Sequence, residues 1–247
     1  MLPNYLRSAG IGPASFNGRI SGRADRICPS GNRPPVRIPY VEHGRCLFGL
    51  NHPVPCVALC PAKAIAFPEK ECGEWYVSDT RFGPFVHAQL YPGQENSGRL
   101  VTLLKQQARE LAKRQGLDLV ICDGSPGVGC PVISSLSGAS LAVAVVEPTP
   151  SGRHDFERVA ALCDHFRIPV AVLINKADLN HEEVQAITRL ADDKGYTVVG
   201  ALPFDPAVTG AMIRRKALTE TDSPLASTLS AIWGRIRELA YAPRKRG

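Results

Sequence analysis

The sequence predicts an α/β fold with a doubly wound, mostly parallel sheet, preceded by a small irregular region that contains cysteines. In the second half, short and wholly apolar runs alternate with helical segments, a pattern typical of parallel strands covered on both faces. In the first 70 residues, ten of the 21 prolines interrupt any helical or strand period. We therefore expect an irregular basic leader over residues 1–45, a small region over 46–95 and an α/β domain over 96–247.

The composition is that of an ordinary globular protein, with 44% hydrophobic and 21% charged residues among 247. This apolar content excludes disorder throughout the chain. The longest apolar runs, such as residues 141–146, are far shorter than the roughly 20 residues of a membrane-spanning helix. The first twenty residues hold no apolar signal segment. We therefore expect a cytoplasmic protein without a membrane span.

The basic charge is concentrated at the start of the chain. Seven arginines against two acids give residues 1–45 a net charge of +5, out of +6 for all 247 residues. The rest of the chain is almost balanced, unlike a domain that is basic throughout in order to bind nucleic acid. We interpret residues 1–45 as a solvated leader and do not expect nucleic acid as a partner.

A helix over residues 97–116 begins the α/β domain. Leu100, Leu104 and Leu111 lie on one stripe at helical spacing, Ser97 precedes the stripe and Gly116 ends it. Four apolar strands follow, at 119–122, 141–146, 169–174 and 196–202, with helices at 152–166, from 180 onward, at 207–216 and at 224–240. The helix from 180 begins with the spacing of a capping box, formed by Asn180 and Glu183.

Residues 73–87 contain aromatic residues and one histidine. Trp75 and Tyr76 are expected to pack in a β-hairpin rather than to stack on bases. His87 is expected to be solvated, because it stands isolated in the sequence.

The loops after the strands are the candidate site, because parallel sheets bind ligands at the carboxyl ends of their strands. Asp123 follows the first strand and precedes a glycine-rich loop with Gly124 and Gly127. A carboxylate in this place can reach Mg²⁺, and the glycines let the backbone approach a phosphate. Asn175 and Lys176 follow the third strand, where the amide can reach a purine edge and the lysine stem can cover the base. Each signal alone also fits a turn or a helix cap, but together they predict a nucleotide-binding sheet.

Several of these loops together resemble the MinD/ParA-type P-loop ATPases, in the branch that carries an inserted ferredoxin-like domain. The resemblance covers about residues 56–220 and rests on six runs. Four lie in the α/β domain: Asp-Gly-Ser-Pro-Gly-Val-Gly-Cys-Pro-Val at 123–132, Glu-Pro-Thr-Pro-Ser-Gly-Arg-His-Asp at 147–155, Ile-Asn-Lys-Ala-Asp at 174–178 and Pro-Phe-Asp-Pro-Ala-Val at 203–208. The other two are Gly-Glu-Trp-Tyr-Val-Ser-Asp-Thr-Arg-Phe-Gly at 73–83 and Glu-Asn-Ser-Gly at 95–98.

The resemblance implies a P-loop NTPase-like fold, with ATP and Mg²⁺ as cofactors and ATPase activity. It implies that Asp123 helps to hold Mg²⁺ as the catalytic residue, that Asn175 contacts adenine and that the loop at Pro203 borders the base. The insert of this branch binds [4Fe–4S] clusters, so residues 46–95 are expected to be a remnant of the ferredoxin-like insert and its link. Members of the family dimerise across nucleotide, which implies a homodimer and an iron–sulfur or redox protein as partner.

The sequence departs from this family at the phosphate-binding loop. The family begins with an apolar strand and a Lys-Gly-Gly-x-Gly-Lys-Thr loop, whose N–H groups and lysines hold the phosphates. The 247 residues contain no such run. We therefore interpret the chain as N-terminally truncated or degenerate relative to the family and expect impaired ATPase activity. The missing strand lies in the centre of the family's sheet, so either 119–122 and 141–146 pair directly or a gap is left.

The cysteines match only half of a ferredoxin motif. Eight cysteines in a cytosolic chain favour thiols or metal over disulfides. Cys56 and Cys60 match the second half of the run Cys-x2-Cys-x2-Cys-x3-Cys-Pro, whereas Leu50 and Pro53 stand at the first two ligand positions. Three interpretations stay open: a [4Fe–4S] cluster with replacement thiolates, a Zn²⁺ site with Cys46, Cys56, Cys60 and one further cysteine, and a relic motif with unligated thiols.

Three functions therefore compete. The first is a MinD-like, iron–sulfur protein that binds ATP, with its ATPase activity impaired by the missing loop. The second is a non-catalytic remnant or partner module built on the same sheet. The third is a [4Fe–4S] electron-transfer carrier that uses the sheet as a scaffold. We favour the first.

Overall fold

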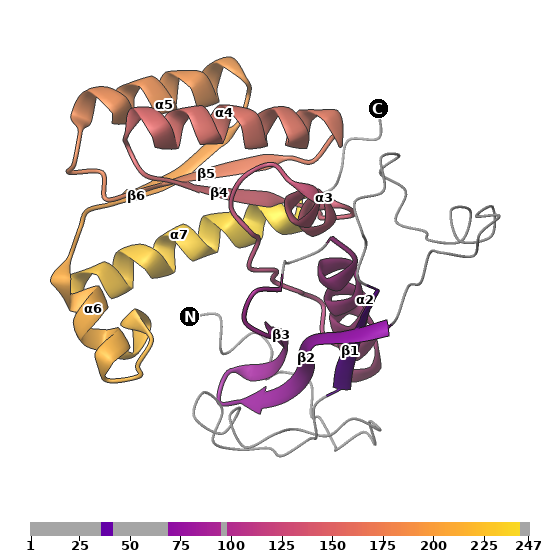
Figure 1. Cartoon of the computed structure of the whole chain (residues 1–247). Helices are drawn as coiled ribbons and strands as arrows, with labels where there is room; N and C mark the ends of the chain where they lie inside the picture. Colours follow the sequence, from indigo (N-terminus) through magenta and orange to yellow (C-terminus); the bar gives the residue numbers. More distant parts are fainter. Residues whose placement is uncertain (1–35, 42–68, 95–97, 243–247) are drawn as a thin grey trace. The chain divides into compact units, whose positions relative to one another are not determined.

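The computed structural model describes residues 36–41, 69–94 and 98–242, which form two compact units (Figure 1). One unit contains the first three strands and residues 103–120, and the other contains residues 98–102 and the chain from Ile121 onward. The elements, in chain order, are β1 (Val36–Val41), β2 (Glu69–Thr80), β3 (Gly83–Leu90), α2 (Gly98–Gln115), α3 (Cys130–Leu136), β4 (Ala142–Val146), α4 (Pro150–His165), β5 (Val170–Asn175), α5 (His181–Asp193), β6 (Thr197–Leu202), α6 (Pro206–Ile213), the 3₁₀ helix η3 (Leu218–Glu220) and α7 (Pro224–Tyr241).

The first unit is built on an antiparallel sheet in the order β1-β2-β3. Trp75 and Tyr76 are buried in β2, which pairs with β3 as the predicted hairpin. The prediction that residues 1–45 hold no regular structure is wrong for β1, which pairs with β2. Pro39 interrupts that strand without ending it, because the register of the pairing shifts between Ile38 and Pro39 and a proline is tolerated at such an irregularity.

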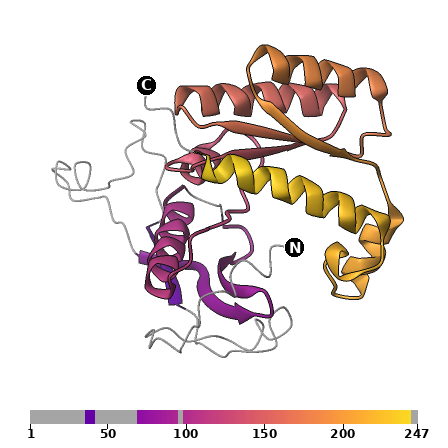
Figure 2. The ribbon, with the colours of Figure 1, turned by 180° about the vertical axis from the view of Figure 1, so that it is seen from behind.

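The second unit is built on a parallel sheet in the order β4-β5-β6. Both ribbon views show α4 and α5 on one face of this sheet and α7 on the other (Figures 1 and 2). The predicted α/β class, with a parallel sheet wound on both faces, is therefore confirmed. Apart from residues 119–122, each predicted strand and helix of the α/β domain forms within a few residues of its expected bounds.

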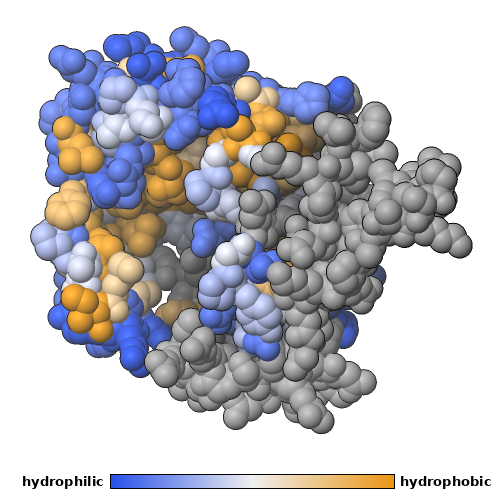
Figure 3. Space-filling view, viewed as in Figure 1, coloured by the Kyte–Doolittle hydropathy of each residue, from blue (hydrophilic) through white to orange (hydrophobic). Residues whose placement is uncertain are grey.

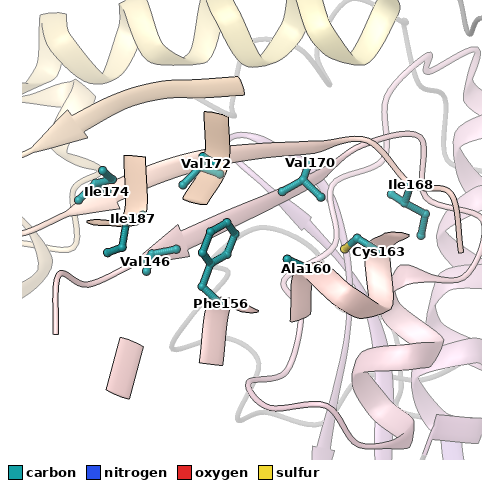
Figure 4. Close-up of a cluster of buried hydrophobic side chains, with 10 residues drawn as sticks. Val146, Phe156, Ala160, Cys163, Ile168, Val170, Val172, Ile174 and Ile187 are labelled. Atoms are coloured by element: carbon teal, nitrogen blue, oxygen red, sulfur yellow. The ribbon is translucent and has the colours of Figure 1, made fainter. Parts of the chain in front are cut away.

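Two apolar clusters hold the helices to the sheet. The larger one joins β4 and β5 to α4 and α5, with Phe156, Val172 and Ile187 among its most buried side chains (Figure 4). The smaller one joins β5 and β6 to Ile232 of α7. Gly200 of β6 allows this contact, since a Cβ atom there would lie 2.6 Å from Cγ1 of Ile232. The surface of this unit is hydrophilic over α4 and α5 and apolar at the level of the sheet and α7 (Figure 3).

The helix beginning at His181 is capped as predicted, but only in one direction. The side-chain oxygen of Asn180 accepts hydrogen bonds from the N–H groups of Glu182 and Glu183, at 3.0 and 3.2 Å. In the predicted capping box, the Glu183 carboxylate would accept a hydrogen bond from the backbone N–H of Asn180. It instead forms an ion pair with Nε of Arg153 on α4, at 2.9 Å. A tertiary ion pair has therefore displaced half of the local capping box.

Residues 119–122 are not a strand, which corrects the sequence prediction. The chain from 117 to 125 lies in neither a helix nor a strand. Within the described ranges, β4 pairs with β5 alone and therefore has one open edge. The sequence left two alternatives at this place: direct pairing of residues 119–122 with β4, or a gap. The structure shows no pairing between these two segments. The short helix α3 between them was not predicted, because its seven residues carry Pro131 and no charged side chain.

No helix in the described part of the chain combines the length and the apolar character needed to cross a membrane.

We expect Ile187→Ala to lower the free energy of unfolding by about 2–5 kcal/mol, because a fully buried side chain would leave a cavity between α5 and the sheet. Ile213→Ala is the matched control, since Ile213 is 78% exposed and its loss should cost less than about 0.5 kcal/mol. Urea unfolding followed by circular dichroism measures both variants. Equal midpoints for the two would contradict the assigned core.

Candidate functional site

The loops after β4, β5 and β6 meet at one edge of the parallel sheet. Val146 is opposite Ile174 in the β4–β5 register, so Glu147 and Asn175 leave the sheet at the same level. Asn175 is in turn opposite Leu202, which precedes Pro203. The structure therefore brings the predicted residues Asn175, Lys176 and Pro203 to a common edge.

An ion pair links the first two of these loops. Nζ of Lys176 lies 2.5 Å from Oε1 of Glu147, and the two side chains are 36% and 45% exposed. The backbone of Lys176 is in the left-handed region, with φ of 56°. This backbone conformation is uncommon for a residue other than glycine and raises the free energy of the fold by about 1–3 kcal/mol. Strained conformations of this kind occur most often at functional sites.

Two hydrogen bonds link the second loop to the third. Oδ1 of Asp178 accepts a hydrogen bond from the backbone N–H of Phe204 at 2.6 Å. The N–H of Ala177 donates to the carbonyl oxygen of Leu202 at 2.9 Å. The ring of Phe204 is left 56% exposed beside this connection. Sequence reasoning placed Asp178 in the Asn-Lys-x-Asp run but did not anticipate its contact with Phe204. It also missed the partner role of Glu147, although both contacts join loops that follow apolar strands.

Asp123, Gly124 and Gly127 lie in residues 117–129, which form neither helix nor strand. Asp123 is exposed, and Gly127 has a left-handed backbone with φ of 89°. The strand that was expected to deliver Asp123 to the carboxyl edge is not formed. The assignment of these three residues to Mg²⁺ and phosphate therefore stays a prediction.

Three side chains of different chemistry stand in the loops at this edge of the sheet. Asn175 offers an amide donor and acceptor, Lys176 a cation and Phe204 an exposed aromatic ring. The carboxylate nearest to them, Glu147, is already paired with Lys176. Within the described ranges, no three histidine, cysteine or acidic side chains are grouped so as to hold a metal ion.

A cleft of about 460 Å³ lies at the opposite, amino ends of β5 and β6, where Arg167, Lys194 and Tyr196 contribute to its lining. Asp164 accepts a hydrogen bond from the hydroxyl of Tyr196 at 2.6 Å and pairs with Nζ of Lys194 at 3.4 Å. These contacts already pair three of its polar side chains with one another. Because the cleft lies at the amino ends of the strands, it is separate from the candidate site at their carboxyl ends.

The predicted metal ligands Cys46, Cys56 and Cys60 lie outside the described residues. Among the described cysteines, Cys122 and Cys130 are exposed. Cys163 is buried, and its burial raises the pKa of the thiol to about 11, so it is protonated at neutral pH. Such a thiol is a packing residue rather than a metal ligand or nucleophile.

His87 corrects the expectation of a solvated histidine. Its ring is stacked on the rings of Tyr76 and Phe85, and its Nε2 lies 3.0 Å from Oγ of Ser78. Burial lowers the pKa of His87. Ser78 is only 1% exposed and His87 is half-buried, so this pair contributes to the packing of the hairpin.

No protein-family model matches this chain. It is 26% identical over 170 residues to Uncharacterized protein MJ0578 of Methanocaldococcus jannaschii, covering 69% of this chain and 56% of that protein. It is 22% identical over 130 residues to Uncharacterized protein MJ0579 of the same organism, covering 53% of this chain and 47% of that protein. The chain thus spans about half the length of the curated relatives it matches.

Two solved structures are similar in part. The MinD cell division protein of Aquifex aeolicus matches with a TM-score of 0.46 and 19% identity, over 55% of this chain and 60% of that one. The cell division ATPase MinD of Pyrococcus furiosus matches with a TM-score of 0.48 and 17% identity, over 58% of this chain and 59% of that one.

We expect Asp178→Ala to speed hydrogen exchange at the Phe204 amide about tenfold, because a hydrogen bond to a carboxylate stabilises its donor by about 1.5–3 kcal/mol. Asp193→Ala, which removes an exposed carboxylate from the end of α5, should leave that amide unchanged. Amide exchange followed by NMR measures both. An unchanged Phe204 amide in Asp178→Ala would show that this contact does not hold the loop.

Proposed function

We propose that this protein is a MinD-like nucleotide-binding protein, which holds a purine nucleotide at the carboxyl edge of β4, β5 and β6. The observation that supports the proposal is the linkage of three consecutive loops through Lys176–Glu147 and Asp178–Phe204. This linkage presents an amide, an ammonium group and an aromatic ring on neighbouring loops. These are groups that recognise a base and an anion.

The base is assigned to Asn175 and Phe204. An asparagine amide can donate one hydrogen bond and accept another, which matches the alternating donors and acceptors of a purine edge. An exposed aromatic ring that stacks on a base contributes about 1–3 kcal/mol. Phe204 is 56% exposed while its backbone is held by Asp178, so the ring is accessible on a fixed loop.

The anionic part of the ligand is assigned to Lys176. Its ion pair with Glu147 is more than one-third exposed on both sides, and such pairs contribute at most about 1 kcal/mol. A hydrogen bond from the ammonium group to a phosphate contributes about 1.5–3 kcal/mol. The exchange of Glu147 for a phosphate oxygen is therefore expected to be favourable.

Hydrolysis by these 247 residues taken alone is proposed to be slow or absent. Phosphoryl transfer depends on fixed positive charges and N–H groups around the phosphates. The 247 residues contain no Lys-Gly-Gly-x-Gly-Lys-Thr run to supply them. In this proposal Asp123 is the residue that would hold Mg²⁺, with Gly124 and Gly127 next to the phosphates. That role requires the segment before Asp123 to reach the sheet.

We expect Lys176→Ala to weaken the binding of ATP or GTP at least about tenfold, because it removes the cation assigned to the phosphates. Lys194→Ala is the matched control, since Lys194 is a lysine of similar exposure in an ion pair with Asp164 at the other end of the strands. Its affinity should change less than about twofold. Isothermal titration calorimetry with each nucleotide measures both variants.

Absence of heat with the wild-type protein at millimolar nucleotide would reject nucleotide binding. It would favour the alternative of a non-catalytic remnant or partner module. Equal weakening by both lysine variants would reject the assignment of Lys176.

A [4Fe–4S] cluster bound through Cys56 and Cys60 is a separate part of the proposal, supported by the Cys-x3-Cys-Pro run alone. We expect anaerobically purified protein to carry about four irons and four sulfides per chain. The double variant Cys56→Ser/Cys60→Ser should lose them, while Cys130→Ser should keep them. Iron-free wild-type protein would reject both the cluster and the electron-carrier alternative. The homodimer and the redox protein partner are also proposals, and both rest on the family resemblance alone.

A further inference from the structure

The cleft at the amino ends of β5 and β6 has an apolar floor. Ile168 and Val170 line it and are buried members of the larger apolar cluster. Leu141 and Leu239 line it too and pack against the smaller cluster. All of the lining residues belong to the second unit, and the volume of about 460 Å³ lies within the roughly 300–1,000 Å³ of known small-molecule sites. The cleft therefore has the size and the apolar surface that a small organic ligand needs.

The charged side chains of the cleft are not evenly matched. The carboxylate of Asp164 accepts a hydrogen bond from Tyr196 and pairs with Lys194, so these three side chains satisfy one another. Arg167 lines the same cleft and is exposed, and its guanidinium forms no ion pair with any residue that the structure describes. The cleft therefore combines an apolar floor with one unmatched positive charge.

The end of α4 gives Arg167 an unusual backbone. Both α4 and α5 end with the same two hydrogen bonds: the left-handed residue donates to the carbonyl three residues earlier at 3.0 Å, and the next residue donates to the carbonyl five residues before it at 2.8 Å. The left-handed residue of this motif is usually glycine. In α5 it is Gly195, with φ of 70°, whereas in α4 it is Arg167, with φ of 54°.

The charge of the helix end does not explain an arginine at this position. The helix dipole favours a cation near the C-terminus of a helix. In α5 that cation is Lys194, which stands one position before the glycine and in the right-handed region. Arg167 therefore carries a steric cost that neither the dipole nor the turn requires. Because strained residues concentrate at ligand sites, the use of its side chain is the feature to explain.

We propose that this cleft binds a small organic carboxylate with an apolar body, held by the guanidinium of Arg167. The planar guanidinium can donate two parallel hydrogen bonds to one carboxylate, which fixes the direction of the ligand as well as its charge. The apolar body then covers the floor formed by Leu141, Val170 and Leu239. An inorganic anion would leave that floor in water, and an amine would place a second cation beside Arg167. The proposal is independent of the nucleotide site, which lies at the carboxyl ends of the same strands.

Three probes of the same shape test the ligand class on the unaltered protein. They are 4-phenylbutyrate, the neutral 4-phenylbutanol and the cationic 4-phenylbutylamine, each titrated into the full chain and followed by NMR. We expect 4-phenylbutyrate to shift the amide signals of Gly195 and Thr197, which line the cleft, in a saturable way. The alcohol and the amine should bind at least about threefold more weakly, because they lack the partner of the guanidinium. Absence of saturable shifts at millimolar 4-phenylbutyrate, equal affinity for the alcohol, or tighter binding of the amine would overturn the proposal.

The variant Arg167→Gly tests the residue. Glycine adopts the left-handed backbone without steric cost, so the unfolding temperature should stay the same or rise while the guanidinium is lost. We expect its affinity for 4-phenylbutyrate to fall to that for the alcohol. Arg189→Ala is the matched control, since Arg189 is an exposed arginine on α5 outside the cleft, and its affinity should equal that of the wild-type protein. Unchanged affinity in Arg167→Gly, or an equal loss in Arg189→Ala, would overturn the assignment of Arg167. None of these readouts depends on nucleotide binding.

Discussion

The complete burial of β5 is the constraint on which the rest of the second unit depends. Ala171 and Val172 are 0% exposed and Ile174 is 1% exposed, so both faces of this strand exclude water. Its neighbours on either side and the helices on both faces pack against it. The strand therefore fixes the level at which Asn175 leaves the sheet and, through the registers with β4 and β6, the levels of Glu147 and Pro203.

The candidate site combines this rigid edge with one contact that contributes little to stability. The ion pair between Lys176 and Glu147 is partly exposed, so replacing Glu147 by another anion costs little free energy. The bond from the Phe204 N–H to Asp178 is instead a contact within the scaffold, which holds the loop while the ring stays accessible. In the proposed nucleotide site, Lys176 exchanges its partner while the bond between Asp178 and Phe204 is kept.

The sequence predicted the parallel strands and their helices because apolar runs specify burial directly. It failed at residues 119–122 because such a run specifies burial but not the neighbour that provides it. It missed β1 because Pro39 signals a break, whereas the pairing with β2 absorbs it through a shift in register. At the site, Asn175 could be anticipated from its place after a strand. The partners of Lys176 and Asp178 could not, because they belong to other loops that meet only in the folded chain.

The left-handed backbone of Lys176 places two demands on one position. Glycine would remove the steric cost of this conformation, about 1–3 kcal/mol for other residues, but would also remove the ammonium group. Variants chosen only for heat resistance should therefore drift toward glycine or asparagine at position 176. Variants chosen for what the edge does should retain a long cationic side chain there, so the outcome of such an evolution experiment distinguishes a working surface from one that is merely inherited.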